Sequence, residues 1–341
     1  MIVACLLLAV PVYSGNKSAK DEAARAQALT LFQKALAVSD IRAPGSPPFE
    51  LQGTVNVHGG DKKDESGTYD LKWASPEQWR EEIRFGDYSR VRVGGKDEYF
   101  QSRSIPYEVP SIFNLSTSLN YLRELHAWAR PDSIASLSNV NIRQRTIGGK
   151  SADCAALIIR KQVNSGPEYC FDTEKGWLLS AGDWARFGRE NAEYSDFISF
   201  GTSAVPSKVR ANEGETAQIQ FNLTSLTHLG ATNGIDLERG EDATEWPSCE
   251  EPDHLTQLTR MTIPRYPLQA VHSRSQGTVV AYAIVGSDGR LHDVKVLDDP
   301  GNGFSTAALF AWSHWEYTPE SCYGRPVPTE TIVQAVFTVG D

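Results

Sequence analysis

Short runs in which hydrophobic and polar residues alternate follow one another along most of this 341-residue chain. Alternation with a period of two predicts strands, and the Gly, Asp, Lys or Pro clusters between the runs predict the turns of an antiparallel meander. The predicted strands before residue 230 are 49–57, 67–73, 78–85, 88–93, 97–101, a run from 142, 155–163, 169–171, 177–180, 194–200, 206–211 and 218–226.

Two stretches of this region have helical spacing instead. Residues 19–38 are rich in alanine and place Leu29, Phe32 and Leu36 on one stripe, which is typical of an amphipathic helix. Residues 111–129 repeat leucine and isoleucine in the same phase. We therefore expect an α+β fold, in which helices cover a curved antiparallel sheet, a half-barrel, over residues 19–235.

The last third of the chain, residues 253–341, has a different order of elements. Two apolar runs, 278–285 and 291–297, flank a Gly-containing four-residue turn at 286–289, which is a hairpin signal. Phe304, Ala308, Ala311 and Trp315 then recur at helical spacing. A final run covers 331–339, so the pattern predicts strand, strand, helix, strand.

This region resembles the TonB C-terminal domain family in the order and spacing of its motifs. The matching motifs are Tyr266-Pro267, a Gly-x-Val from Gly277, Asp288-Gly289 in the hairpin turn, Trp315-Glu316-Tyr317-Thr318-Pro319 after the helix, and Gly324-Arg325-Pro326-Val327 before the last strand. The resemblance implies a periplasmic domain that holds a short peptide of an outer-membrane receptor by adding it as a strand, with main-chain hydrogen bonds supplying affinity.

The last predicted strand supports the same interpretation by itself. Between Thr331 and Val339 there is no charge, no proline and no glycine, although exposed edge strands are usually protected by such residues. The strand either accepts a peptide, or lies inside the sheet, or is covered by the same strand of a second copy in a homodimer. The candidate peptide-binding residues are Tyr266, Pro267, Thr331, Val333, Ala335, Phe337 and Val339.

The first region is similar to the LolA/LolB-like lipoprotein carriers. The similarity rests on residues 49–53, 67–69, 79–83 and 170–179. It implies an incomplete barrel whose concave side holds acyl chains through many apolar side chains. Such side chains line an open cavity or fill a packed core, and protein interiors are usually packed. The candidate cavity residues are Trp73, Trp79, Phe85, Phe100 and Phe113.

The first residues of the chain indicate its compartment, and its net charge argues against two classes of partner. An apolar stretch from Ile2 to Val12 predicts a secretory signal at residues 1–14, too short for a membrane span. If it is retained instead of cleaved, we expect association with the inner membrane. A net charge of −10 argues against nucleic acid as a partner and against an anionic membrane surface.

Four cysteines remain after the signal, and an even number in an exported chain predicts disulfides. Of the three connectivities we favour Cys154 with Cys170 and Cys249 with Cys322. The alternative is four buried thiols. No Cys-x-x-Cys pair occurs and the seven histidines are scattered, so we expect no metal site.

Residues 236–252 are predicted to be an acidic linker, because seven acidic residues stand against one basic residue between 236 and 251. No nucleophile elbow, phosphate loop or metalloprotease motif occurs in the chain. We therefore expect no enzymatic activity and no cofactor.

Three functions are compatible with these patterns. The first is a periplasmic protein that binds an extended peptide of an outer-membrane receptor, or another envelope protein. The second is a carrier of lipid or lipoprotein that docks through its C-terminal domain. The third is a structural envelope protein.

Overall fold

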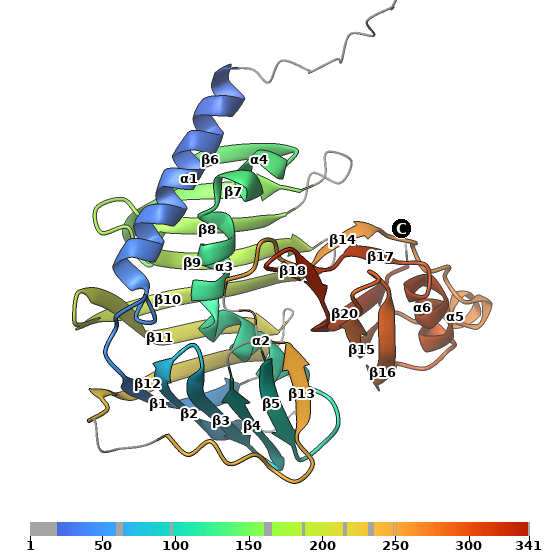
Figure 1. Cartoon of the computed structure of the whole chain (residues 1–341). Helices are drawn as coiled ribbons and strands as arrows, with labels where there is room; N and C mark the ends of the chain where they lie inside the picture. Colours follow the sequence, from blue (N-terminus) through green and yellow to red (C-terminus); the bar gives the residue numbers. More distant parts are fainter. Residues whose placement is uncertain are drawn as a thin grey trace, which may run out of the picture.

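The computed structural model describes residues 19–58, 64–95, 98–159, 166–185, 188–213, 217–230, 235–247, 249 and 251–339. The predicted signal segment lies outside these residues. We call residues 19–247 the N-terminal unit and residues 253–339 the C-terminal unit; Figure 1 shows them side by side.

The N-terminal unit is built on one curved antiparallel sheet of 13 strands. Its strand order is β13-β5-β4-β3-β2-β1-β12-β11-β10-β9-β8-β7-β6, so two meanders meet where β1 pairs with β12. The strands are β1 Phe49–His58, β2 Glu65–Ser75, β3 Gln78–Phe85, β4 Tyr88–Gly94, β5 Glu98–Arg103, β6 Asn139–Ile147, β7 Lys150–Ile158, β8 Pro167–Asp172, β9 Leu178–Ala185, β10 Gly188–Phe200, β11 Ser203–Glu213, β12 Ala217–His228 and β13 Thr244–Pro247.

The junction of the two meanders depends on one glycine. The register between β1 and β12 shifts at Gln52 and Gly53, which marks a β-bulge. A Cβ atom on Gly53 would lie 2.1 Å from a ring carbon of Phe221, so glycine at this position leaves the space that the Phe221 ring occupies.

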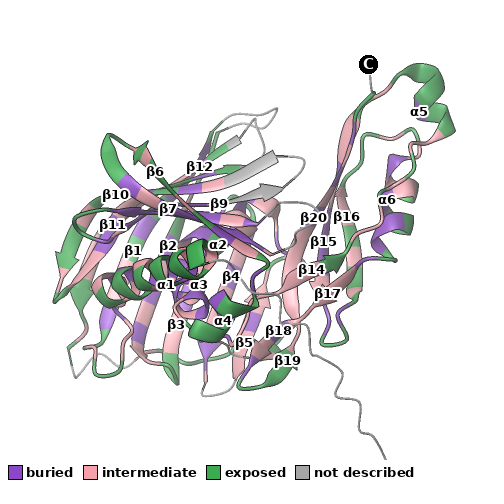
Figure 2. Ribbon diagram, turned by 90° about the horizontal axis from the view of Figure 1, so that it is seen from above, coloured by how far each residue is buried: buried purple, intermediate pink, exposed green. Residues whose placement is uncertain are grey.

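Helices cover one face of the curved sheet (Figures 1 and 2). They are α1 Ala19–Ser39, α2 Pro110–Leu119, α3 Tyr121–Trp128 and α4 Pro131–Ser136. The predicted helix over 111–129 is in fact two helices that meet at Asn120, whose ψ of 25° departs from helical values while its N–H still bonds to the carbonyl of Ser116.

The helix α1 buries a narrow stripe rather than a broad leucine face. Arg25, Ala28, Phe32 and Ala35 are buried along it, whereas Leu29 and Leu36 are only partly buried beside them. The ring of Phe32 packs edge-on against Tyr169 and Phe171, each with centroids 5.1 Å apart. Small alanines allow this close approach, which brings Phe32 onto the sheet.

The C-terminal unit contains the predicted strand, strand, helix and strand as β15, β16, α6 and β20, with three short strands before the last one. The sheet order is β16-β15-β20, and α6 lies over one of its faces (Figure 2). The elements are β14 Gln257–Arg260, α5 Leu268–Ser273, β15 Gly277–Val285, β16 Leu291–Asp298, α6 Phe304–Trp312, β17 Glu316–Thr318, β18 Glu320–Cys322, β19 Arg325–Val327 and β20 Thr329–Phe337.

The predicted acidic linker, residues 236–252, contains a strand that its composition does not predict. Residues Thr244 to Pro247 form β13 and extend the large sheet by pairing with β5. Arg239 of this segment also stacks over the ring of Phe100, with its guanidinium carbon 3.4 Å from the centroid. The part of the segment that the structure describes is therefore attached to the N-terminal unit.

No helix within the described ranges has both the length and the apolar character that crossing a membrane requires.

The buried stripe of α1 gives a stability prediction. We expect Phe32→Ala to lower the free energy of unfolding by about 3–5 kcal/mol, because it removes a fully buried ring from the core. The matched control is Phe310→Ala on α6, a ring that is 64% exposed, with an expected change within about 0.5 kcal/mol. Denaturant unfolding of both variants is the measurement, and equal losses would contradict this account of the core.

Candidate functional site

The strand β20 is an edge strand. It pairs antiparallel with β15 from Thr329 opposite Val285 to Phe337 opposite Gly277, and on its other side no strand pairs with it among the residues that the structure describes. Its main-chain groups on that side are the kind of template to which another extended chain can add.

The two edges of this sheet differ in how they are protected. On β16 the register with β15 shifts twice, Asp293 has a positive φ of 50°, and Lys295 adds a charge. Bulges and charges of this type prevent strand addition. On β20 the one charged residue is Glu330, near its start. Strand addition is therefore favoured at β20 and disfavoured at β16.

The candidate peptide-binding residues divide into two groups. The alternate residues Val333, Ala335 and Phe337 are buried in the core under α6, so a peptide at this edge would meet the main chain of β20 rather than these side chains. Tyr266 packs edge-on against Phe304 and Phe337, and its hydroxyl donates to the carbonyl of Ser275. Of the remaining candidates, Thr331 is half-buried, Pro267 precedes α5 and Val339 is 41% exposed.

Of the five candidate cavity residues, three belong to or pack against the main core of the N-terminal unit, and Trp73 lies opposite Trp79 across β2 and β3. Trp73 and Phe85 are buried in the main core, where Trp73 stacks on Phe49 with centroids 5.5 Å apart. Trp79 packs against the same core and against Tyr99. The other two candidates are Phe100, under Arg239, and Phe113 on α2, both half-buried.

The start of β20 is held by the N-terminal unit through the Glu330 carboxylate. Arg103 of β5 donates to Glu330 Oε1 over 2.7 Å and Arg92 of β4 donates to Oε2 over 3.3 Å. The hydroxyl of Tyr282, on β15, donates to Oε1 over 2.6 Å. The Glu330 side chain is only 8% exposed, so this is a buried ion pair between the two units.

Arg90, a neighbour of Arg92 on β4, forms further ion pairs inside the N-terminal unit. Arg90 is 1% exposed and donates to Glu81 over 2.9 Å, to Glu108 over 2.6 Å and to the Ser116 hydroxyl over 3.0 Å. We call Glu81, Arg90, Arg92, Arg103, Glu108 and Glu330 the interface ion cluster. A buried charge of this kind is tolerated only where it is paired.

The cluster favours the ionised form of two of its carboxylates, Glu330 and Glu81. Burial acts to raise the pKa of Glu330, but Arg92 and Arg103 outweigh it, so the pKa lies below its ordinary value of 4.5. Burial and the arginines oppose each other in the same way at Glu81, whose pKa is also lowered. Burial first, and then the Glu330 charge, raises the pKa of the Tyr282 hydroxyl, which remains a donor.

A second attachment holds the C-terminal unit at strand β18. The structure contains the disulfides Cys154–Cys170 and Cys249–Cys322, the pairing that the sequence favours. Arg123 of α3 donates to the carbonyl of Cys249 over 2.9 Å and pairs with Glu320.

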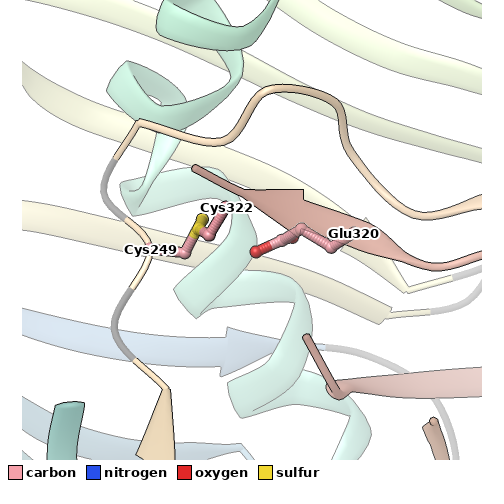
Figure 3. A group of neighbouring side chains, drawn as sticks. All are labelled: Cys249, Glu320 and Cys322. Atoms are coloured by element: carbon pink, nitrogen blue, oxygen red, sulfur yellow. A yellow bond between two sulfur atoms is a disulfide. The ribbon is translucent and has the colours of Figure 1, made fainter. Parts of the chain in front are cut away.

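Cys249, Glu320 and Cys322 lie together in Figure 3, with their donor atoms within 4.8 Å of one another. Both sulfur atoms belong to the disulfide, so they are not thiolate ligands for a metal ion. The Cys249–Cys322 disulfide therefore links the segment after β13 covalently to strand β18.

No motif or periodicity in the sequence singles out the residues of the interface ion cluster. The one signal available was Glu330 itself, a single acidic residue at the start of an otherwise uncharged strand. Its partners lie 227 and 238 residues away along the chain, which no local pattern connects.

The pKa directions predict how stability depends on pH. Because the folded-state pKa values of Glu330 and Glu81 lie below 4.5, their stabilisation is complete above that pH and is lost as the pH falls below it. We expect Glu330→Gln to be less stable than the wild type at neutral pH and to lose less further stability on acidification. Thermal unfolding from about pH 7 to about pH 3 measures both; parallel curves would contradict the assignment.

Comparison with solved structures finds two kinds of similarity. A LolA superfamily protein from Nitrosomonas europaea is 10% identical, with 60% of this chain and 94% of that chain covered and a TM-score of 0.37. An outer membrane lipoprotein-sorting protein domain from Vibrio parahaemolyticus is 11% identical, with 63% and 97% covered and a TM-score of 0.40. The TonB C-terminal domain of Pseudomonas aeruginosa is 26% identical, with 25% and 88% covered and a TM-score of 0.23.

No curated protein matches the chain. Residues 262–339, which contain α5, β15, β16, α6 and β20, match the model of the Gram-negative bacterial TonB protein C-terminal family.

Proposed function

We propose that this chain is a periplasmic envelope protein whose C-terminal unit binds an extended peptide of a partner protein by adding it as a strand to β20. The observation that carries the proposal is the unprotected edge of β20 beside the protected edge of β16. The match of residues 262–339 to the TonB C-terminal family supports it. Two disulfides favour an oxidising compartment such as the periplasm.

The proposed site at β20 requires little of the side chains of the peptide that it binds. Because Val333, Ala335 and Phe337 are buried under α6, affinity comes mainly from main-chain hydrogen bonds along β20. Near Thr329 the strand lies beside Thr256, whose hydroxyl donates to that of Thr329 over 3.4 Å, and beside the ion cluster. The part that accepts a peptide is therefore the half that ends at Phe337.

We propose an outer-membrane receptor as the source of the peptide, and binding without catalysis as the activity. The packed surroundings of Trp73 and Phe85 give no support to lipid carriage, so we do not propose that function.

Peptide titration followed by NMR tests the proposal. A peptide from the periplasmic end of an outer-membrane receptor is expected to shift the amide signals of β20 and to slow their hydrogen exchange by about tenfold or more, since they gain main-chain partners. The amides of β16 are expected to be unchanged. A peptide with two central prolines, which lack N–H donors, is the control. Equal effects of both peptides, or effects at β16 instead, would contradict strand addition at β20.

A further inference from the structure

The charges at the rim of the N-terminal unit do not balance within that unit. The interface ion cluster contains three guanidinium groups from this unit, those of Arg90, Arg92 and Arg103, but only the two carboxylates of Glu81 and Glu108. The third carboxylate, Glu330, belongs to the C-terminal unit. Without it the rim would keep one buried positive charge too many, which is costly.

The uncompensated charge is localised at Arg92 and Arg103. Arg90 has its two carboxylates and a hydroxyl at 2.6–3.0 Å. Arg92 reaches Glu81 and Glu108 only at 3.7 and 3.8 Å, and Arg103 reaches Glu108 at 3.8 Å. Their short contact with a carboxylate is the one to Glu330, at 2.7 Å from Arg103. The two guanidinium groups therefore converge on one carboxylate that arrives from outside their unit.

We propose that Arg92 and Arg103 form a carboxylate-binding site at the rim of the N-terminal unit, occupied in this structure by Glu330 as an exchangeable internal ligand. The ligand class is an acidic side chain on an extended segment, because Glu330 reaches the site from a strand. A partner segment of this kind takes the place of Glu330 when the C-terminal unit moves away.

The position of the disulfide allows Glu330 to leave its site while the two units stay covalently joined. The Cys249–Cys322 bond and the pair Arg123–Glu320 hold the C-terminal unit through β18, whereas the carboxylate site holds it through β20. When Glu330 leaves its site, the unit stays attached at the disulfide. The inference concerns a site on the N-terminal unit and is independent of whether β20 binds a peptide.

Chemical rescue tests the site in the full-length oxidised protein. Glu330→Ala leaves a space the size of a carboxylate between Arg92 and Arg103. Hydrogen exchange in β4, β5 and the start of β20 is expected to become about tenfold faster or more, while α6 stays protected. Acetate is expected to reverse this change, compared with chloride at the same ionic strength. The matched control is Glu316→Ala, which removes a half-exposed carboxylate paired with Arg260 and Arg290 within the C-terminal unit.

Several outcomes of this experiment would overturn the proposal. They are wild-type exchange in Glu330→Ala, the same effect of acetate and chloride on that variant, or rescue of the Glu316→Ala control by acetate. If Glu330→Ala does not fold, Glu330→Gln keeps the shape of the side chain. Faster exchange confined to the facing strands of the two units then supports the site, and unchanged exchange rejects it.

The class of ligand is tested with a peptide probe. A synthetic peptide with the sequence of residues 327–333 is expected to bind the Glu330→Ala protein at least about tenfold more tightly than the same peptide carrying Glu330→Gln, because only the first supplies a carboxylate to two guanidinium groups. Fluorescence anisotropy measures both affinities. Equal affinities of the two peptides would show that the site does not select a carboxylate.

Discussion

The contact between the Glu330 carboxylate and two arginines of the neighbouring unit completes the set of buried charges where the two halves of this protein meet. Three buried arginines on a sheet would be unstable without matching carboxylates. Two of these come from the same unit, Glu81 on β3 and Glu108 in the segment before α2, and the third comes from an edge strand of the C-terminal unit. The N-terminal sheet therefore has a balanced set of buried charges only when the C-terminal sheet is docked on it.

This arrangement gives the two ends of β20 different environments. At the Thr329 end the strand is held by ion pairs, by Thr256 and by the neighbouring unit. At the Phe337 end its side chains still pack under α6, but the adjoining Val339 is exposed. One strand thus connects a rigid interface to a more open edge, so a partner that pairs with the open end contacts a strand whose other end is anchored.

Local patterns were enough to predict most of the elements but not how they combine. The strands of the meander, the leading helix and the order β15, β16, α6 and β20 follow from periodicity and turn residues, which are short-range signals. The break at Asn120, the helix α5 and the strand β13 were missed, because each is short and depends on what it packs against. The interface ion cluster was missed for a different reason: Arg92, Arg103 and Glu330 are ordinary surface residues by sequence, and only the tertiary fold brings them together and buries them.

The Cys249–Cys322 disulfide divides the C-terminal unit into a part inside a covalent ring and a part outside it. The covalent ring that it closes contains β14, α5, β15, β16, α6, β17 and β18, whereas β19 and β20 follow it. The last strand therefore lies outside the covalent ring, and the contacts that hold it beside β15 and at Arg92 and Arg103 are all non-covalent, so disulfide formation can close the ring without fixing the position of β20.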